Sequence, residues 1–109
     1  MAWEIDPRNR NTGLPLEGVR VLDLSRVLAG PYCAMVLGDL GADVIKVEKP
    51  DVGDSLRGMA WKDPRDGTGL WWKLVNRNKR NIALDLKLES DREIFLKLVD
   101  DADVLVENF

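Results

Sequence analysis

Short apolar segments recur along the chain, and each is followed by a segment with helical or irregular spacing. Residues 19–24 (VRVLDL) are β-branched and apolar, which is typical of a strand buried on both faces. Residues 43–48, 82–86 and 103–107 repeat this pattern. The sequence therefore predicts four short strands.

The connection between the first two strands has the features of a helix. Pro31 occupies the first turn, where its missing N–H costs nothing, and Gly41 occupies the position of a left-handed C-cap. Residues at helical spacing predict the buried face of this helix: Cys33, Val36, Leu37 and Leu40.

The second half of the chain predicts another long helix. Ser90 is a good N-cap with Glu93 three residues later, which forms a capping box and starts a helix that runs to Asp101. Its expected buried face consists of Ile94, Phe95, Leu98 and Val99. Residues 50–69 predict a long surface loop, and residues 69–75 a short helix.

This order of strands and helices predicts an α/β fold, a Rossmann-like and mainly parallel open sheet with helices on its faces. Residues 1–15 lack periodicity and predict an extended arm, so the sheet domain begins at residue 16. In such sheets, ligands bind at the carboxyl ends of the strands.

Composition narrows the possible functions. The net charge of −3 argues against a dedicated nucleic-acid binder, and no run of 18 apolar residues is present to cross a membrane. The single cysteine, Cys33, indicates a reducing compartment, and we expect a cytoplasmic protein. There is no histidine, and the aspartates form no metal pattern, so we expect neither a metal site nor a catalytic residue here.

The first strand-to-helix loop, residues 25–31, could bind a phosphate at the helix N-terminus or serve as a plain connection. It has a single glycine, Gly30, and so lacks the G-x-G-x-x-G pattern of a dinucleotide site. Glu48 stands where such a site holds its ribose-binding acid. That placement alone is weak support for NAD binding, because a charged strand end is common.

Residues 73–80 (KLVNRNKR) contain four basic side chains and no acid. A solvated face, a nucleic-acid patch and an anionic ligand site are the three explanations, and composition favours them in that order. Three tryptophans lie nearby and could form an acyl pocket, although burial against another domain or subunit fits better: Trp61, Trp71 and Trp72.

Several stretches occur in the order and spacing of one known family. These are residues 16–24 (LEGVRVLDL), 26–31 (RVLAGP), 37–48 (LGDLGADVIKVE), 53–54 (GD), 76–80 (NRNKR) and 102–109 (ADVLVENF). Together they resemble the start of a family III CoA-transferase, also called the CaiB/BaiF family. This family includes formyl-CoA, carnitine and succinate-type CoA-transferases, and α-methylacyl-CoA racemase is a relative.

The resemblance implies that coenzyme A (CoA) lies across the carboxyl ends of the strands. By motif position its contacts would fall on Arg26, Leu28, Ala29, Lys49, Leu84, Asp85, Leu86, Lys87, Asn108 and Phe109. We expect its phosphates to be bound by Lys49, Lys79, Arg80 and Lys87. Arg26 departs from formyl-CoA transferase, which has histidine at this position.

The activity implied is exchange of CoA between an acyl-CoA donor and a small carboxylic acid, with acyl-CoA as substrate and no covalently bound cofactor. The family's nucleophilic aspartate lies beyond residue 109, so we expect a truncated part of the large domain of an interlocked homodimer. Two alternatives stay open: an acyl-CoA racemase of the same family, and a non-catalytic nucleotide-binding or interaction module. We expect neither nucleic acid nor a membrane as a partner.

Overall fold

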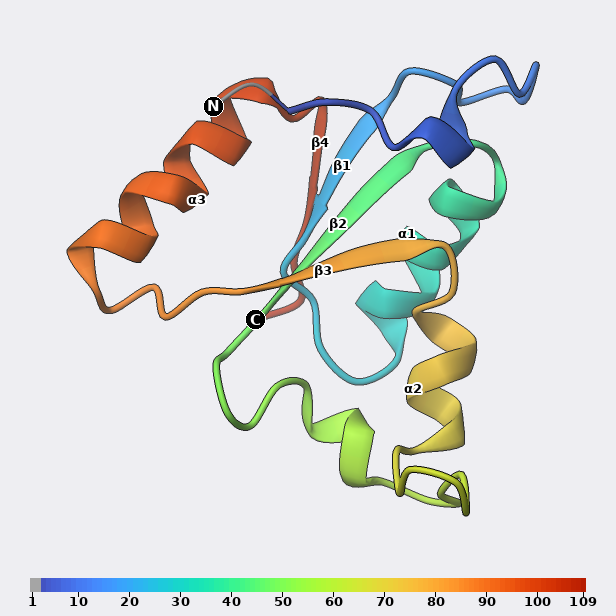
Figure 1. Cartoon of the computed structure of the whole chain (residues 1–109), viewed down its shortest axis with the longest axis vertical. Helices are drawn as coiled ribbons and strands as arrows, with labels where there is room; N and C mark the ends of the chain where they lie inside the picture. The colour runs from blue at the N-terminus through green and yellow to red at the C-terminus, as the bar shows by residue number, and fades with distance from the viewer. Residues whose placement is uncertain (1–2) are drawn as a thin grey trace.

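The computed structural model of the protein describes residues 3–109 and contains a four-stranded parallel sheet (Figure 1). The strands are β1 (Arg20–Asp23), β2 (Asp43–Glu48), β3 (Lys79–Ala83) and β4 (Val104–Val106). Their order in the sheet is β3-β2-β1-β4, and every neighbouring pair is parallel. The predicted parallel α/β sheet is confirmed.

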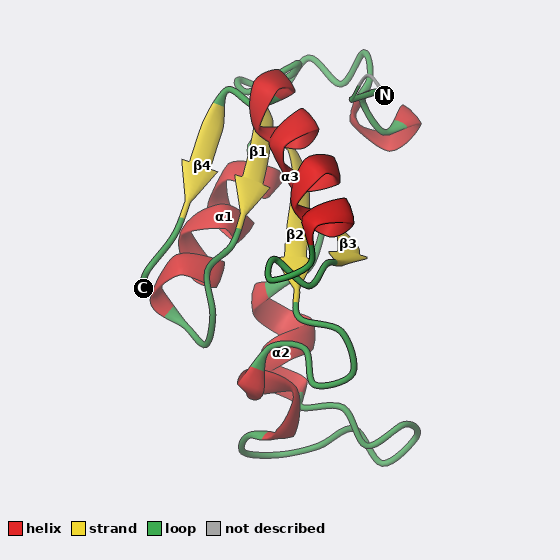
Figure 2. Cartoon of the chain, turned by 90° about the vertical axis from the view of Figure 1, so that its left-hand side faces the viewer, coloured by secondary structure: helices red, strands yellow, loops and turns green. Residues whose placement is uncertain are grey.

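Helices cover both faces of this sheet (Figure 2). α1 (Ala29–Asp39) packs on one face beside α2 (Leu70–Val75), and α3 (Glu89–Asp101) packs on the other. Two short 3-10 helices are also present, at Pro7–Asn9 in the N-terminal arm and at Ser55–Gly58 in the connection from β2 to α2. Within residues 3–109, no helix is long and apolar enough to cross a membrane.

Strand residues alternate between two separate apolar clusters, as the two-residue period of a strand requires. On the α3 face, Leu22, Leu24 and Val47 pack with Leu84 and Leu98. On the α1 face the cluster is smaller and consists of Val21, Ala34, Ala42 and Val44. The sheet is therefore covered on both sides, and ligands can approach it at the ends of its strands.

The predicted buried face of α1 was largely wrong. Cys33, Val36 and Leu40 are exposed, and Leu37 is half-buried. The residues that face the sheet are mostly small: Gly30, Pro31, Ala34, Met35 and Gly38. The helix backbone approaches the sheet closely, since a Cβ on Gly38 would lie 3.4 Å from Cγ2 of Val44 in β2. Gly41 has a φ of 108°, which confirms the left-handed C-cap.

Two boundaries also differ from the prediction. β3 begins at Lys79, three residues before the expected start, because Lys79 pairs with Val44 of β2. α3 begins at Glu89, and Ser90 does not cap it. Instead, the carboxylate of Asp91 accepts a hydrogen bond of 2.8 Å from the backbone N–H of Asp85, which joins the helix start to the preceding loop.

The N-terminal arm is folded against the end of the sheet at which the strands begin. Trp3 is buried, and its indole N–H donates to Asp43 over 2.8 Å. The arm is therefore less extended than expected. Met1 and Ala2, the first residues of the expected arm, lie outside the described residues.

Candidate functional site

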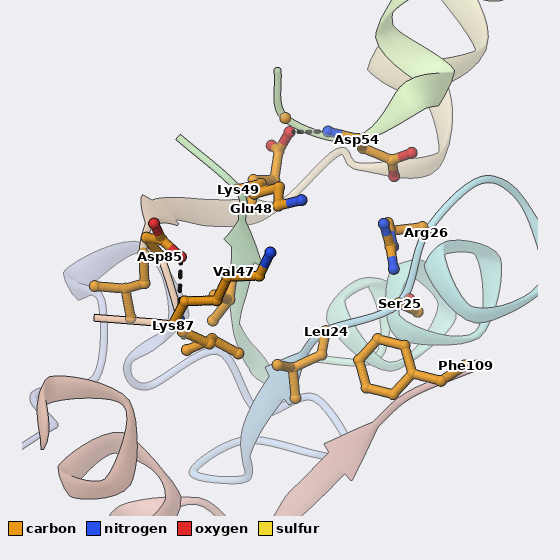
Figure 3. Close-up of a pocket in the computed structure, with 13 residues that line it drawn as sticks. Leu24, Ser25, Arg26, Val47, Glu48, Lys49, Asp54, Asp85, Lys87 and Phe109 are labelled. Carbon is orange, nitrogen blue, oxygen red and sulfur yellow. Dashed lines mark hydrogen bonds between the residues drawn. The ribbon is translucent and has the colours of Figure 1, made fainter. Parts of the chain in front are cut away.

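A cleft of about 190 Å³ opens at the carboxyl edge of the sheet, where the four strands end (Figure 3). Segments that follow all four strands contribute to it, as expected for a ligand site in a parallel α/β sheet. Its lining residues are Leu24, Ser25, Arg26, Val47, Glu48, Lys49, Gly53, Asp54, Leu84, Asp85, Leu86, Lys87 and Phe109.

Part of the cleft surface is apolar because the α3-side cluster extends to this edge. Leu24, Val47 and Leu84 belong to that cluster, and Leu86 packs against it. Phe109 follows β4, lines the cleft and is 81% exposed as a residue. An exposed aromatic ring beside buried aliphatic side chains can bind a flat organic group such as a nucleotide base.

Three basic side chains of the cleft are exposed: Arg26, Lys49 and Lys87. None of them forms an ion pair with any residue in the range 3–109. The Arg26 guanidinium lies 5.9 Å from the centre of the Phe109 ring, so charge and aromatic surface meet at one side of the cleft. These three cations are available to an anionic ligand.

Two of the cleft's carboxylates, by contrast, are already neutralised. Glu48 receives hydrogen bonds from the Arg57 guanidinium at 2.7 and 2.8 Å, and Asp54 receives one from Lys46 Nζ at 3.0 Å. Burial alone would raise the pKa of Glu48, but Arg57 and the Asp54 backbone N–H outweigh it and lower the pKa. The third carboxylate, Asp85, accepts from the Lys87 backbone N–H at 3.0 Å. The cleft therefore has a surplus of positive charge.

The predicted site residues fall into three groups: those that line the cleft, those that follow β1 or β4 without lining it, and those held elsewhere in the sheet. Most line the cleft: Arg26, Lys49, Leu84, Asp85, Leu86, Lys87 and Phe109. Asn108 does not line the cleft, but its side chain accepts a hydrogen bond from the Arg26 backbone N–H at 3.0 Å and donates one to the Arg26 carbonyl at 2.8 Å. Leu28 and Ala29 are exposed at the start of α1, outside the lining.

Lys79 and Arg80 form the third group, which the structure does not bring to the cleft. The Lys79 side chain is fully buried and donates to Asp23 over 2.9 Å, and Arg80 donates to Asp43 over 2.6 Å at the opposite end of the sheet. The other basic residues of 73–80 are paired too, Lys73 with Asp63 and Asp66, and Arg77 with Asp39. The run is a solvated face only in part, because Arg77 is exposed and Lys73 and Arg80 are half-buried, whereas the Lys79 side chain is buried.

Six lining residues were not among the predicted site residues: Leu24, Ser25, Val47, Glu48, Gly53 and Asp54. The first four stand at strand ends, so the position of the strands could have indicated them. Gly53 and Asp54 come from the long loop after β2, and no local pattern shows where that loop returns. Of the three tryptophans, Trp61 is 74% exposed, and none of them lines the cleft.

Comparison with known proteins relates this fold to a group of enzymes. The family profile of CoA-transferase family III matches residues 16–109. The chain is 52% identical over 97 residues to succinyl-CoA:mesaconate CoA-transferase of Haloarcula hispanica, which covers 86% of this chain and 24% of that protein. It is 51% identical over 109 residues to human succinyl-CoA:glutarate CoA-transferase, covering 98% of this chain and 24% of that protein.

Solved structures agree with these matches. A CaiB/BaiF family protein from Brucella suis superposes with a TM-score of 0.80 at 42% identity, over 88% of this chain and 26% of that one. A protein from Mycobacterium tuberculosis gives a TM-score of 0.74 at 39% identity, over 84% and 24%. The chain thus spans about a quarter of the length of these relatives. By its sequence and its fold, it belongs to CoA-transferase family III.

Proposed function

We propose that the cleft binds the nucleotide end of an acyl-CoA, and that the complete protein transfers CoA from this donor to a small carboxylic acid. The observation that carries the proposal is a group of three exposed cations around an apolar surface at the carboxyl edge: Arg26, Lys49 and Lys87, which have no ion-pair partner among residues 3–109. Related enzymes are named for succinyl-CoA with mesaconate, glutarate or L-malate, so we propose a dicarboxylic acid as the acceptor.

The chemistry of CoA matches these groups. Its 3′-phosphate and pyrophosphate require cationic partners, and its adenine is a flat ring. Lys49 and Lys87 would act as point charges for the phosphates, Arg26 as a two-pronged donor, and the Phe109 ring as a surface for the base. Each phosphate contact at this partly exposed site should contribute about 1–2 kcal/mol and weaken with salt.

We further propose that the residues of this chain bind and orient the thioester, while the nucleophile lies outside it. In the expected reaction, a carboxylate oxygen attacks the thioester carbonyl, the CoA thiolate leaves, and a mixed anhydride forms. The CoA thiolate then attacks the enzyme carbonyl of this anhydride, which releases the donor acid as a carboxylate and leaves an enzyme–CoA thioester. The acceptor carboxylate displaces CoA from that thioester to form a second anhydride, and the CoA thiolate attacks its acceptor carbonyl, which gives the new acyl-CoA and frees the enzyme carboxylate. We also propose a cytoplasmic homodimer, and note that a malate-specific relative is named as an α subunit.

Calorimetry on the complete protein tests this assignment by comparing CoA, dephospho-CoA and NAD. We expect CoA to bind several-fold more tightly than dephospho-CoA, since the 3′-phosphate is lost, and NAD to bind most weakly. Equal binding of NAD and CoA would contradict the phosphate assignment. CoA binding without acyl exchange between succinyl-CoA and a dicarboxylic acid would favour a binding module or a racemase.

A further inference from the structure

The loop that presents Arg26 to the cleft has a strained backbone. It joins β1 to α1, and Val27 within it has a φ of 69°. A β-branched residue rarely adopts this left-handed conformation, and such strain persists only where the surroundings hold it. Asn108 brackets Arg26 on one side, so the question is what holds Val27.

A buried ion pair lies directly against this loop. The Asp54 carboxylate accepts the Val27 N–H at 3.1 Å and the Leu56 N–H at 3.0 Å, and it accepts from Lys46 Nζ at 3.0 Å. Lys46 Nζ also donates to the Ser25 carbonyl at 2.9 Å. Both charged side chains are 0% exposed, and both carboxylate oxygens of Asp54 already accept hydrogen bonds from the protein. Asp54 is therefore poorly placed to bind a ligand itself.

The backbone of Asp54 is itself held in place by Glu48. Its backbone N–H donates to Glu48 over 2.8 Å, as Figure 3 shows, and Glu48 is bound by Arg57. The Arg57 guanidinium stacks 3.8 Å from the centre of the Trp72 ring. A continuous set of contacts thus runs from α2 through the end of β2 to the β1–α1 loop.

Net stability is a poor explanation for the Lys46–Asp54 pair. Removing two charges from water is expensive, and a buried ion pair is often no more stabilising than apolar side chains of the same size. Its contacts converge on Ser25 and Val27, the two neighbours of Arg26. The location of the pair therefore indicates that it fixes the conformation of the β1–α1 loop.

We propose that Asp54 is a positioning residue: it holds Val27 in its left-handed conformation and thereby aims Arg26 at the cleft. Lys46 balances its charge. The identity of the ligand as CoA rests on the proposed function, whereas the positioning of the loop does not. The hydrogen bond from Val27 N–H should be the critical contact, and the charge of Asp54 should matter less than its oxygen.

Two double variants separate the acceptor from the charge. Lys46→Met with Asp54→Asn keeps an oxygen for Val27 N–H, whereas Lys46→Met with Asp54→Leu removes it. Both eliminate the buried pair completely, so neither leaves an uncompensated ion. Asp63→Ala is the matched control, because Asp63 is also a buried, ion-paired carboxylate of the 50–69 loop and does not line the cleft.

Two measurements on the complete protein are needed: calorimetric binding of CoA, and hydrogen exchange of the amides of residues 25–28. Relative to the asparagine variant, the leucine variant should bind CoA about tenfold more weakly and exchange these amides about tenfold faster, as expected for loss of the buried hydrogen bond from Val27 N–H. The leucine also removes the acceptor of Leu56 N–H, but that amide lies outside residues 25–28. Asp63→Ala should lower the melting temperature while changing neither quantity by more than about twofold.

Equal affinities and equal exchange rates in the two double variants would overturn the inference, as would an equal loss of CoA affinity in Asp63→Ala. The failure of the proposed function looks different. If the wild-type protein binds no CoA, the ligand assignment fails, and the exchange rates of residues 25–28 alone decide whether Asp54 positions the loop.

Discussion

The two ends of the sheet use charge in different ways. At the amino end, Asp43 is 1% exposed and accepts four hydrogen bonds. The donors are the Trp3 indole, the Asp6 N–H, the Asn9 amide and the Arg80 guanidinium, at 2.8, 3.2, 3.1 and 2.6 Å. Three of these donors belong to the N-terminal arm, so the Asp43 carboxylate holds the arm against this end of the sheet.

At the carboxyl end, three cations remain exposed and without a carboxylate partner in the described part of the chain: Arg26, Lys49 and Lys87. A charged group that is buried and paired serves the fold, whereas one left exposed at a cleft is available to a ligand. The pairing of each basic residue therefore decides its role better than its position in a basic run does.

Lys79 gives the strongest test of this distinction, because it was expected to bind phosphate but is buried and paired. Lys79→Met should lower the free energy of unfolding by about 3–5 kcal/mol, since Asp23 would keep a buried charge without its partner. Urea unfolding of the complete protein measures this loss.

The control is the double variant Lys79→Met with Asp23→Asn, which removes both charges, keeps an oxygen for the Ser25 N–H and should recover most of the stability. CoA affinity of the folded double variant should match the wild type. If the double variant is stable but has lost CoA affinity, Lys79 contributes to CoA binding and the distinction fails.

Gly30 tests how closely α1 approaches the carboxyl end. A Cβ at this position would lie 2.1 Å from Cβ and 2.6 Å from Oγ of Ser25, so Gly30→Ala must displace the helix or the loop. We expect a loss of about 1–3 kcal/mol by urea unfolding. Gly58→Ala is the matched control, because its Cβ would meet nothing within 4 Å, and an equal loss there would contradict the packing argument.

Acid should destabilise the carboxyl end. Burial would raise the pKa of Asp54, but the hydrogen bonds from Leu56, Lys46 and Val27 outweigh it, and its pKa is lowered in the folded state, as is that of Glu48. The same carboxyls bind protons more readily in the unfolded chain. The two carboxylates therefore contribute fully to the free energy of unfolding above their unfolded pKa, and this contribution is lost as pH falls through their folded pKa.

Unfolding free energies measured by urea from pH 7 down to pH 3 would show this loss. Lys46→Met with Asp54→Asn removes one of the two titrating carboxylates and should reduce the slope of stability against pH in the acidic range. An unchanged slope in this double variant would mean that Asp54 does not contribute.

The sequence predicted the parallel sheet well, because short β-branched segments with helical connections permit few other arrangements. The family resemblance implied contacts at Arg26, Lys49, Lys87 and Phe109, and all four line the cleft. This agrees with their positions after strand ends, which meet at one edge of a parallel sheet.

The predictions failed where a contact between distant segments decides the outcome. The pairing of Lys79 with Asp23 spans 56 residues, and no local pattern indicates it. The buried face of α1 was misjudged because close packing selected small residues such as Gly30 and Ala34, while the pattern weighed hydrophobicity alone.

The smallest expected effect comes from a single exposed cation, and it tests whether the unpaired charges of the carboxyl end bind the ligand. Lys49→Ala should weaken CoA binding several-fold, by about 1–2 kcal/mol, and leave turnover at saturating thioester nearly unchanged, because a remote phosphate contact is present throughout the reaction. Lys97→Ala, which removes an exposed lysine on α3 away from the cleft, should change neither. The difference between the two variants should shrink as salt screens the contact. If Lys97→Ala weakens binding as much as Lys49→Ala, the net charge of the protein matters and the position of Lys49 does not.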